Sequence, residues 1–91
     1  MMKDIVEARP LDGYELYLRF EDGTDGVVDI AKLISFHGVF EPLKSRAYFE
    51  QVQVNTELGT VFWPNGADLD PDVLYAVVSG VPIPSYQGVR R

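Results

Sequence analysis

The segment YELYLRFEDGTDGVVDI, residues 14–30, contains the pattern that decides the fold of this chain. Polar and apolar residues alternate from Tyr14 to Phe20, which places the even-numbered side chains on one face of a strand. Asp22-Gly23 then supplies a turn, because this pair tolerates the positive φ that a tight hairpin requires. Residues 25–30 return as the partner strand. The sequence therefore predicts an antiparallel hairpin here.

Shorter elements separated by turns flank this hairpin. Asp29 and Ser45 are expected to cap short helices, because an Asp or Ser side chain accepts hydrogen bonds from the first free amides of a helix. The expected elements are a strand over 3–9, a helix over 30–34, a tight turn or one 3₁₀ turn over 38–43, a helix over 46–50, and strands over 51–54 and 60–63. The chain is thus predicted to be α+β: a small antiparallel sheet of about five strands, short helices, and a buried C-terminal helix.

That last helix has clear start and stop residues. Asp70 is the expected N-cap, followed by a proline at the first helical position, and Gly80 ends the helix. Residues 73–78 are apolar on every side of the helix, so a sheet can cover only part of it. The rest is expected to be covered by the segment after residue 80, by a second copy of the chain or by another protein.

Length and composition indicate one domain. The chain has 91 residues, of which 46% are hydrophobic, and it contains no cysteine, which excludes disulfides, thiolate metal sites and cysteine nucleophiles. We expect a single α+β domain over residues 1–80 and an extended C-terminal tail over 81–91.

Charge narrows the classes of partner. Eight basic residues against 14 acidic residues give a net charge of −6, which argues against direct binding to the phosphate backbone of a nucleic acid. The N-terminus has no apolar stretch of signal-peptide length, and the apolar run at 73–78 is far too short to cross a bilayer. No membrane association and a cytoplasmic location are therefore expected.

The carboxylates and the single histidine suggest catalytic or metal sites only weakly. Asp68, Asp70 and Asp72 have the spacing of the first ligands of a calcium loop, but the glycine and glutamate that such a loop needs further on are missing. An enzyme that uses a divalent metal is the least favoured function. Its metal would be held by these carboxylates or by the acidic residues of the hairpin turn, which are Glu21, Asp22, Asp25 and Asp29. His37 has no serine nucleophile elbow to work with, so a turn role is favoured over catalysis. We expect no catalytic residue, no metal site and no cofactor.

The segment WPNGAD, residues 63–68, is the most distinctive stretch outside the hairpin. Its tryptophan, Trp63, follows a strand and precedes a turn. Such a residue is either a binding anchor at an interface or a plug that closes the core, and we favour the plug. If the segment forms a surface, its candidate interaction or ligand residues are Trp63, Asn65, Asp68 and Tyr75.

These segments resemble a family. The stretches FEDG (20–23), GVFEPL (38–43) and above all WPNGADLDPDVLY (63–75) are similar to the small bacterial domain of unknown function 2442, over about residues 3–80. The resemblance implies a compact α+β fold and brings no catalytic residues with it. In some relatives this domain precedes a DNA-binding helix-turn-helix domain in the same chain. We do not expect direct DNA binding of that kind here. Other relatives are encoded beside a second small protein, as in toxin–antitoxin pairs.

Three functions follow in order of preference. The first is a non-enzymatic protein-interaction or regulatory module. It is antitoxin-like, and its partner is another protein with a basic surface. The second is a small-ligand sensor with Trp63, Asn65 and Tyr75 around a shallow site. The third is the metal-assisted carboxylate enzyme. A homodimer is predicted separately, because the helix over 73–78 is apolar on every side and an open small sheet has exposed edges.

Overall fold

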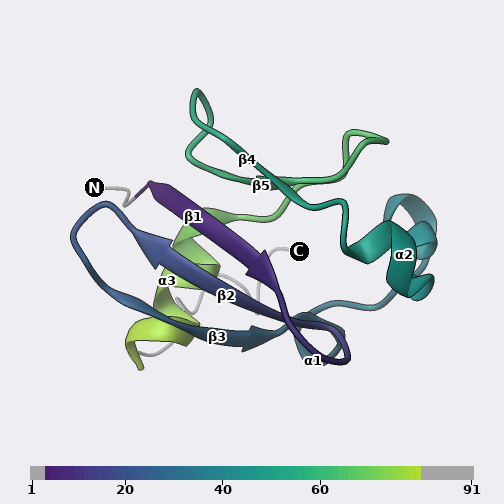
Figure 1. Cartoon of the computed structure of the whole chain (residues 1–91), viewed down its shortest axis with the longest axis horizontal. Coiled ribbons are helices and arrows are strands. Elements are labelled where there is room, and N and C mark those ends of the chain that lie inside the picture. The colour runs from purple at the N-terminus through teal and green to yellow at the C-terminus, as the bar shows by residue number, and fades with distance from the viewer. Residues whose placement is uncertain (1–3, 81–91) are drawn as a thin grey trace, which may run out of the picture.

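The computed structural model describes residues 4–80, which form nine elements (Figure 1). They are β1 (Ile5–Pro10), β2 (Glu15–Phe20), β3 (Asp25–Asp29), α1 (Ile30–Leu33), the 3₁₀ helix η1 (Gly38–Lys44), α2 (Arg46–Phe49), β4 (Gln53–Asn55), β5 (Thr60–Phe62) and α3 (Pro71–Ser79). The α+β class, the five antiparallel strands and the C-terminal helix are confirmed. The predicted tail over 81–91 lies outside the described residues.

The first three strands form an antiparallel sheet in the order β1-β2-β3. The hairpin predicted from the alternating segment is β2–β3, in a register that pairs Leu18 with Gly26 and Leu16 with Val28. The even-numbered side chains of β2 are fully buried, as the alternation predicts. This sheet therefore has one face on the core and one face toward solvent.

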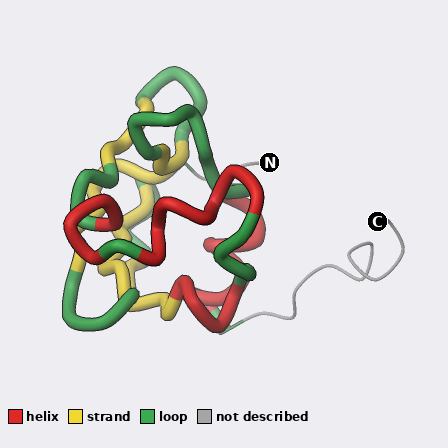
Figure 2. Tube along the Cα trace, turned by 90° about the vertical axis from the view of Figure 1, so that its right-hand side faces the viewer, coloured by secondary structure: helices red, strands yellow, loops and turns green. Residues whose placement is uncertain are grey.

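Helix α3 packs on the inner face of the sheet against β3. Figure 1 shows α3 behind the sheet, and Figure 2, seen from the side, shows helical segments on the far side of the strands. Gly26 makes the close approach feasible, because a Cβ built on it would lie 3.0 Å from Cγ1 of Val78. The helix lies this close to the sheet because β3 has no side chain at that position.

The second sheet is the separate hairpin β4–β5, which packs beside β1. The Ile5 amide donates to the Gly59 carbonyl at 2.9 Å, and Phe62 forms an isolated bridge with Asp68. The first residue of β1 is therefore bonded to this hairpin, whereas no described residue bonds to the backbone groups of Ala8 further along the same edge. In Figure 1, β3 is the edge strand of the first sheet on the side away from β1.

The predicted helix caps are confirmed. Asp29 Oδ1 accepts from the Ala31 amide, Ser45 Oγ from the Tyr48 amide, and Asp70 Oδ1 from the Asp72 amide. Residue 80 ends α3 in the left-handed conformation, with φ at 82°.

Several strand limits differ from the sequence prediction by one or two residues, among them those of β1, β4 and β5. Strand β1 extends to Pro10, one residue beyond the expected strand over 3–9. The Leu11 amide bonds to Glu15, so the alternation of hydrogen bonds turns the nitrogen of Pro10 away from β2, where it needs no partner. Strand β4 begins at Gln53, after the turn that ends α2. Strand β5 ends at Phe62, one residue before the tryptophan.

The C-terminal helix is only partly buried. Leu74 and Ala76 are covered by the core, whereas Val77 is 36% exposed. The residues described here thus leave one side of α3 open, and the segment that was expected to cover it lies outside them.

Candidate functional site

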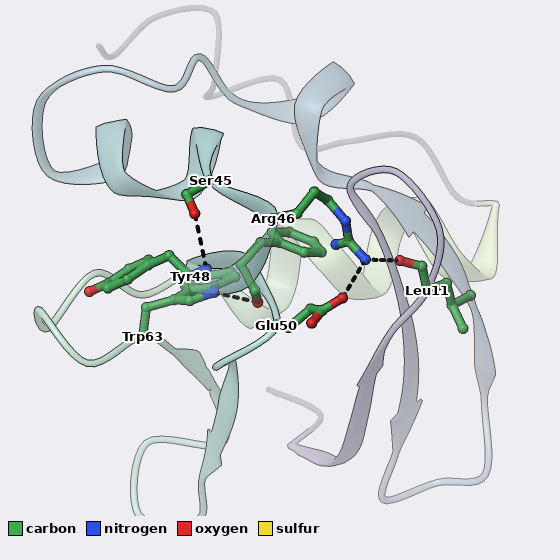
Figure 3. Close-up of polar contacts among 7 residues, drawn as sticks. Leu11, Ser45, Arg46, Tyr48, Glu50 and Trp63 are labelled. Carbon is green, nitrogen blue, oxygen red and sulfur yellow. Dashed lines mark hydrogen bonds and ion pairs between the residues drawn. The ribbon is translucent and has the colours of Figure 1, made fainter.

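Trp63 is a core residue. Its side chain is 0% exposed, and its indole Nε1 donates a hydrogen bond to the Phe49 carbonyl at 3.0 Å (Figure 3). Its ring lies 6.0 Å from the Phe49 ring, centroid to centroid. A buried indole whose N–H is satisfied inside the protein has no surface left for a partner. This burial is what the core-plug interpretation of Trp63 predicts.

Asn65 is exposed but fully engaged in local structure. Its Nδ2 donates to the Val39 carbonyl at 2.9 Å, and its Oδ1 accepts from the Ala67 amide at 3.1 Å. Its own amide donates to the Tyr48 hydroxyl at 2.8 Å. These bonds attach the loop after β5 to η1 and α2. Asn65 therefore has a structural role in holding this loop against the two helices.

Tyr75 belongs to a different place in the molecule. Its hydroxyl donates to Asp22 Oδ2 at 2.7 Å, and its ring makes an edge contact with Phe20 at 5.0 Å. It therefore ties α3 to the β2–β3 turn, whereas Asn65 contacts η1 and α2. The structure does not bring the tryptophan segment and Tyr75 together as one site.

The remaining carboxylates and the histidine form no constellation. Asp68 is exposed on the loop that pairs with Phe62, and Asp70 serves as the helix cap. Within residues 4–80, no group of histidine and acidic side chains is arranged to hold a metal ion. His37 is exposed, precedes η1 and makes no side-chain cap bond there.

A cleft of about 510 Å³ lies between the β1–β2 turn and α2. Arg46 is its central side chain: Nη2 donates to the Leu11 carbonyl at 3.0 Å and to Glu50 Oε2 at 2.8 Å (Figure 3). The guanidinium also lies 5.4 Å from the Phe49 ring centroid. These bonds join the turn to α2, which gives Arg46 a bridging role. Pro10, Leu11, Asp12, Glu15, Arg46 and Glu50 line the cleft.

The solvent face of the first sheet carries an ordered polar network. Arg9 stacks on the Tyr17 ring at 4.5 Å, and Arg19 pairs with Glu7 at 3.1 Å. The Tyr17 hydroxyl donates to Asp25 Oδ2 at 2.8 Å, and this bond raises the pKa of Tyr17. The polar side chains on this face therefore interact with one another.

The outer edge of β3 is a place where backbone groups are left open. Bonds from Phe20 to Thr24 and from Ile30 to Tyr14 fix which residues of the hairpin exchange hydrogen bonds, and these are the even-numbered ones. The N–H and C=O groups of Asp25 and Val27 therefore point away from β2. Among residues 4–80, nothing bonds to the Val27 backbone groups, and the Val27 side chain is 50% exposed.

An apolar groove of about 240 Å³ lies beside this edge, between β3, α1 and α3. Val28, Leu33 and Val77 supply its apolar surface, and Asp29 and Lys32 supply its polar rim. Sequence reasoning predicted that the sheet would have open edges, but it could not identify β3. The apolar residue on the polar side of that strand, Val27, was the available signal.

A family model described as "Protein of unknown function (DUF2442)" matches residues 5–79. The chain belongs to this family. The match includes every element of the DUF2442 fold described above, from the first residue of β1 to the last residue of α3. No curated protein and no solved structure matches the chain significantly. In the part of this DUF2442 chain that the structure describes, no helix is long and apolar enough to span a membrane.

Proposed function

We propose that this DUF2442 protein is a non-enzymatic interaction module that binds a basic protein partner, as an antitoxin-like protein does. The observation that carries the proposal is the distribution of charge. All 14 acidic residues lie between Asp4 and Asp72, whereas three of the eight basic residues, Lys3, Arg90 and Arg91, lie outside that range. Every arginine within it pairs with a glutamate.

This arrangement has a kinetic consequence. An unbalanced acidic surface attracts an oppositely charged protein over about one Debye length, roughly 10 Å at 0.1 M salt. Attraction of this kind raises the association rate and has less effect on the dissociation rate. The partner that fits is a protein with a basic surface.

The polar side chains singled out in the sequence do not compete with this proposal. Asn65 and Tyr75 each form bonds that hold two parts of the fold together, and Asp70 caps α3. Those bonds give them a structural role, which supports placing the function on the charged surface.

The test is capture of the partner from the native cell, followed by kinetics with the purified pair. We expect a stoichiometric basic protein whose association rate falls steeply as salt rises. A Glu21→Lys, Glu57→Lys, Asp68→Lys variant should associate at least about tenfold more slowly at low salt, because three exposed acids are reversed. The matched control, Lys44→Glu, should associate at least as fast as the parent.

Two outcomes would contradict the proposal. One is an association rate that does not change between low and high salt. The other is a captured partner with an acidic surface, for which the reversed variant would associate faster than the parent.

A further inference from the structure

We propose that the outer edge of β3, with the groove beside it, binds an extended basic segment of the partner by antiparallel strand addition. This inference rests on the proposed function and names the surface that performs it. The β3 edge is defined here as Asp25–Asp29 together with the groove residues Leu33 and Val77.

The backbone of the β3 edge is open at Val27. Val27 presents an N–H and a C=O that no described residue bonds, on a strand at the border of a three-stranded sheet. An extended peptide placed there in antiparallel orientation exchanges two hydrogen bonds with Val27, as the next strand of a sheet does. Strand addition of this kind obtains its affinity from backbone bonds and its specificity from alternate side chains.

The edge has a different surface on each side. On the core side, the groove offers Val28, Leu33 and Val77 to the side chains of an added strand. On the solvent side, Asp25, Val27 and Asp29 alternate along the strand. An added strand thus meets apolar surface with Lys32 at its rim on one face and two carboxylates on the other.

The negative charges along β3 favour a basic occupant. Asp25 uses Oδ2 for the Tyr17 hydroxyl, and Asp29 uses Oδ1 for the Ala31 amide. Each carboxylate has a second oxygen, and opposite charges facing across strands stabilise a pair of strands. The segment that fits has basic side chains four residues apart, with apolar residues at the two positions that face the groove.

A second copy of the chain fits this edge poorly. A two-fold pairing of β3 with β3, centred on Val27, places Asp25 of each copy opposite Asp29 of the other. Like charges directly opposite one another are destabilising. The charge pattern therefore favours a foreign basic strand over self-association at this edge.

The test uses a synthetic peptide with the core Lys-Val-Thr-Val-Lys, titrated into the full chain while amide exchange is followed by NMR. We expect the Val27 amide to gain at least about tenfold protection, whereas the amides that already bond to β2 change little. The same peptide N-methylated at the threonine lacks the central donor and should not protect Val27. A Glu-Val-Thr-Val-Glu peptide tests the charge requirement and should not bind.

Variants of the protein test the two faces of the added strand. Asp25→Asn with Asp29→Asn retains both local hydrogen bonds and should weaken peptide binding about fivefold through loss of two charge pairs. Val77→Lys places a like charge in the groove and should abolish binding. Its control is Leu58→Lys, at a residue that is 55% exposed on the β4–β5 turn and should bind as the parent does. Unchanged fluorescence of buried Trp63 reports that each variant is folded.

Each other occupant has its own result, and each would overturn the inference. Protection of Val27 that rises with protein concentration assigns the edge to a second copy. Protection in the free chain that does not depend on concentration assigns it to residues of the chain itself. Equal binding of the lysine and glutamate peptides, or shifts confined to the Arg46 cleft, also contradicts it. If the captured partner shows salt-steered association but ignores the β3 variants, only this inference fails and the proposed function stands.

Discussion

The loop around Trp63 and the edge of β3 are opposite in how their polar groups are satisfied. In the loop, the indole N–H, the Asn65 amide side chain and the turn backbone all bond within the protein. At the β3 edge, the Val27 backbone groups have no bond among the described residues. The loop with the most distinctive sequence is thus structural, and the strand with an ordinary sequence is the open one.

This difference teaches that a rare residue type is a poor guide to function when its polar atoms are already paired. An aromatic residue contributes to binding through surface that remains exposed, and Trp63 has none. An unpaired strand edge needs no unusual residue, because backbone groups form the contact. The predictions below test the two sides of this comparison.

The largest effect is expected at Trp63. Trp63→Ala should lower the free energy of unfolding by about 3–5 kcal/mol, because it empties a large volume in the core. Trp63→Phe should cost about 1–3 kcal/mol through lost volume and one lost hydrogen bond. Chemical denaturation followed by far-UV circular dichroism measures both changes. A Trp63→Ala chain as stable as the parent would mean that the residue is a surface anchor after all.

Asn65 is expected to show the next largest effect. Asn65→Ala removes the bonds to Val39 and Ala67 and should cost about 1–2 kcal/mol of unfolding free energy. Asp68→Ala, at an exposed residue of the same loop, should change it by less than about 0.5 kcal/mol. Thermal or urea unfolding of the pair provides the check. Equal small effects, with loss of partner binding in Asn65→Ala alone, would return the loop to a functional role.

Gly26 tests the packing behind the β3 edge. Gly26→Ala should cost about 1 kcal/mol, because its Cβ would crowd Val78, whose branched side chain is confined to one rotamer in a helix. The methyl resonances of Val78 should shift in the same variant. A gain in stability with unshifted methyl resonances would show that α3 is not held close to β3.

The smallest effect concerns Tyr17, and it is a shift in titration. The bond to Asp25 raises the pKa of Tyr17 above its ordinary value of 10.0, followed in weight by desolvation and by the charges of Asp25 and Glu7. Because the pKa is raised in the folded state, the stabilisation is present below pH 10.0 and is lost as pH rises through the folded pKa.

Asp25→Ala removes both the hydrogen bond and the charge and should lower the Tyr17 pKa toward 10.0 in an NMR titration of the ring. The effect on stability is expected to be slight, since the pair is exposed to solvent. An unchanged Tyr17 pKa in the variant would mean that the hydroxyl does not bond to Asp25 in solution.

Local patterns predicted much of the fold. The alternation from Tyr14 to Phe20 predicted the buried face of β2, and the capping residues Asp29, Ser45 and Asp70 all predicted helix starts. These features depend on neighbours within a few residues, which the sequence displays directly. The end of β1 could not be predicted from local sequence. Pro10 fits into the strand only when its nitrogen points away from β2, and the register between β1 and β2 decides that direction.

The candidate site was harder to predict because it depends on contacts between distant residues. Trp63 could be assigned to core or surface only once its bond to Phe49, 14 residues earlier, was seen. Tyr75 bonds to Asp22 across 53 residues, so its separation from the tryptophan loop was not visible in the sequence. The open edge followed from strand order, which no local pattern encodes.

The most direct test of the account is amide hydrogen exchange along β3 and the tryptophan loop in the free full-length chain. Val28 and Gly26 should exchange slowly, Val27 between them should exchange nearly as fast as an unstructured peptide, and the Trp63 amide, bonded to the Ala67 carbonyl, should be protected. That alternation would establish an open edge beside a closed loop. A protected Val27 amide together with a rapidly exchanging Trp63 amide would contradict the account.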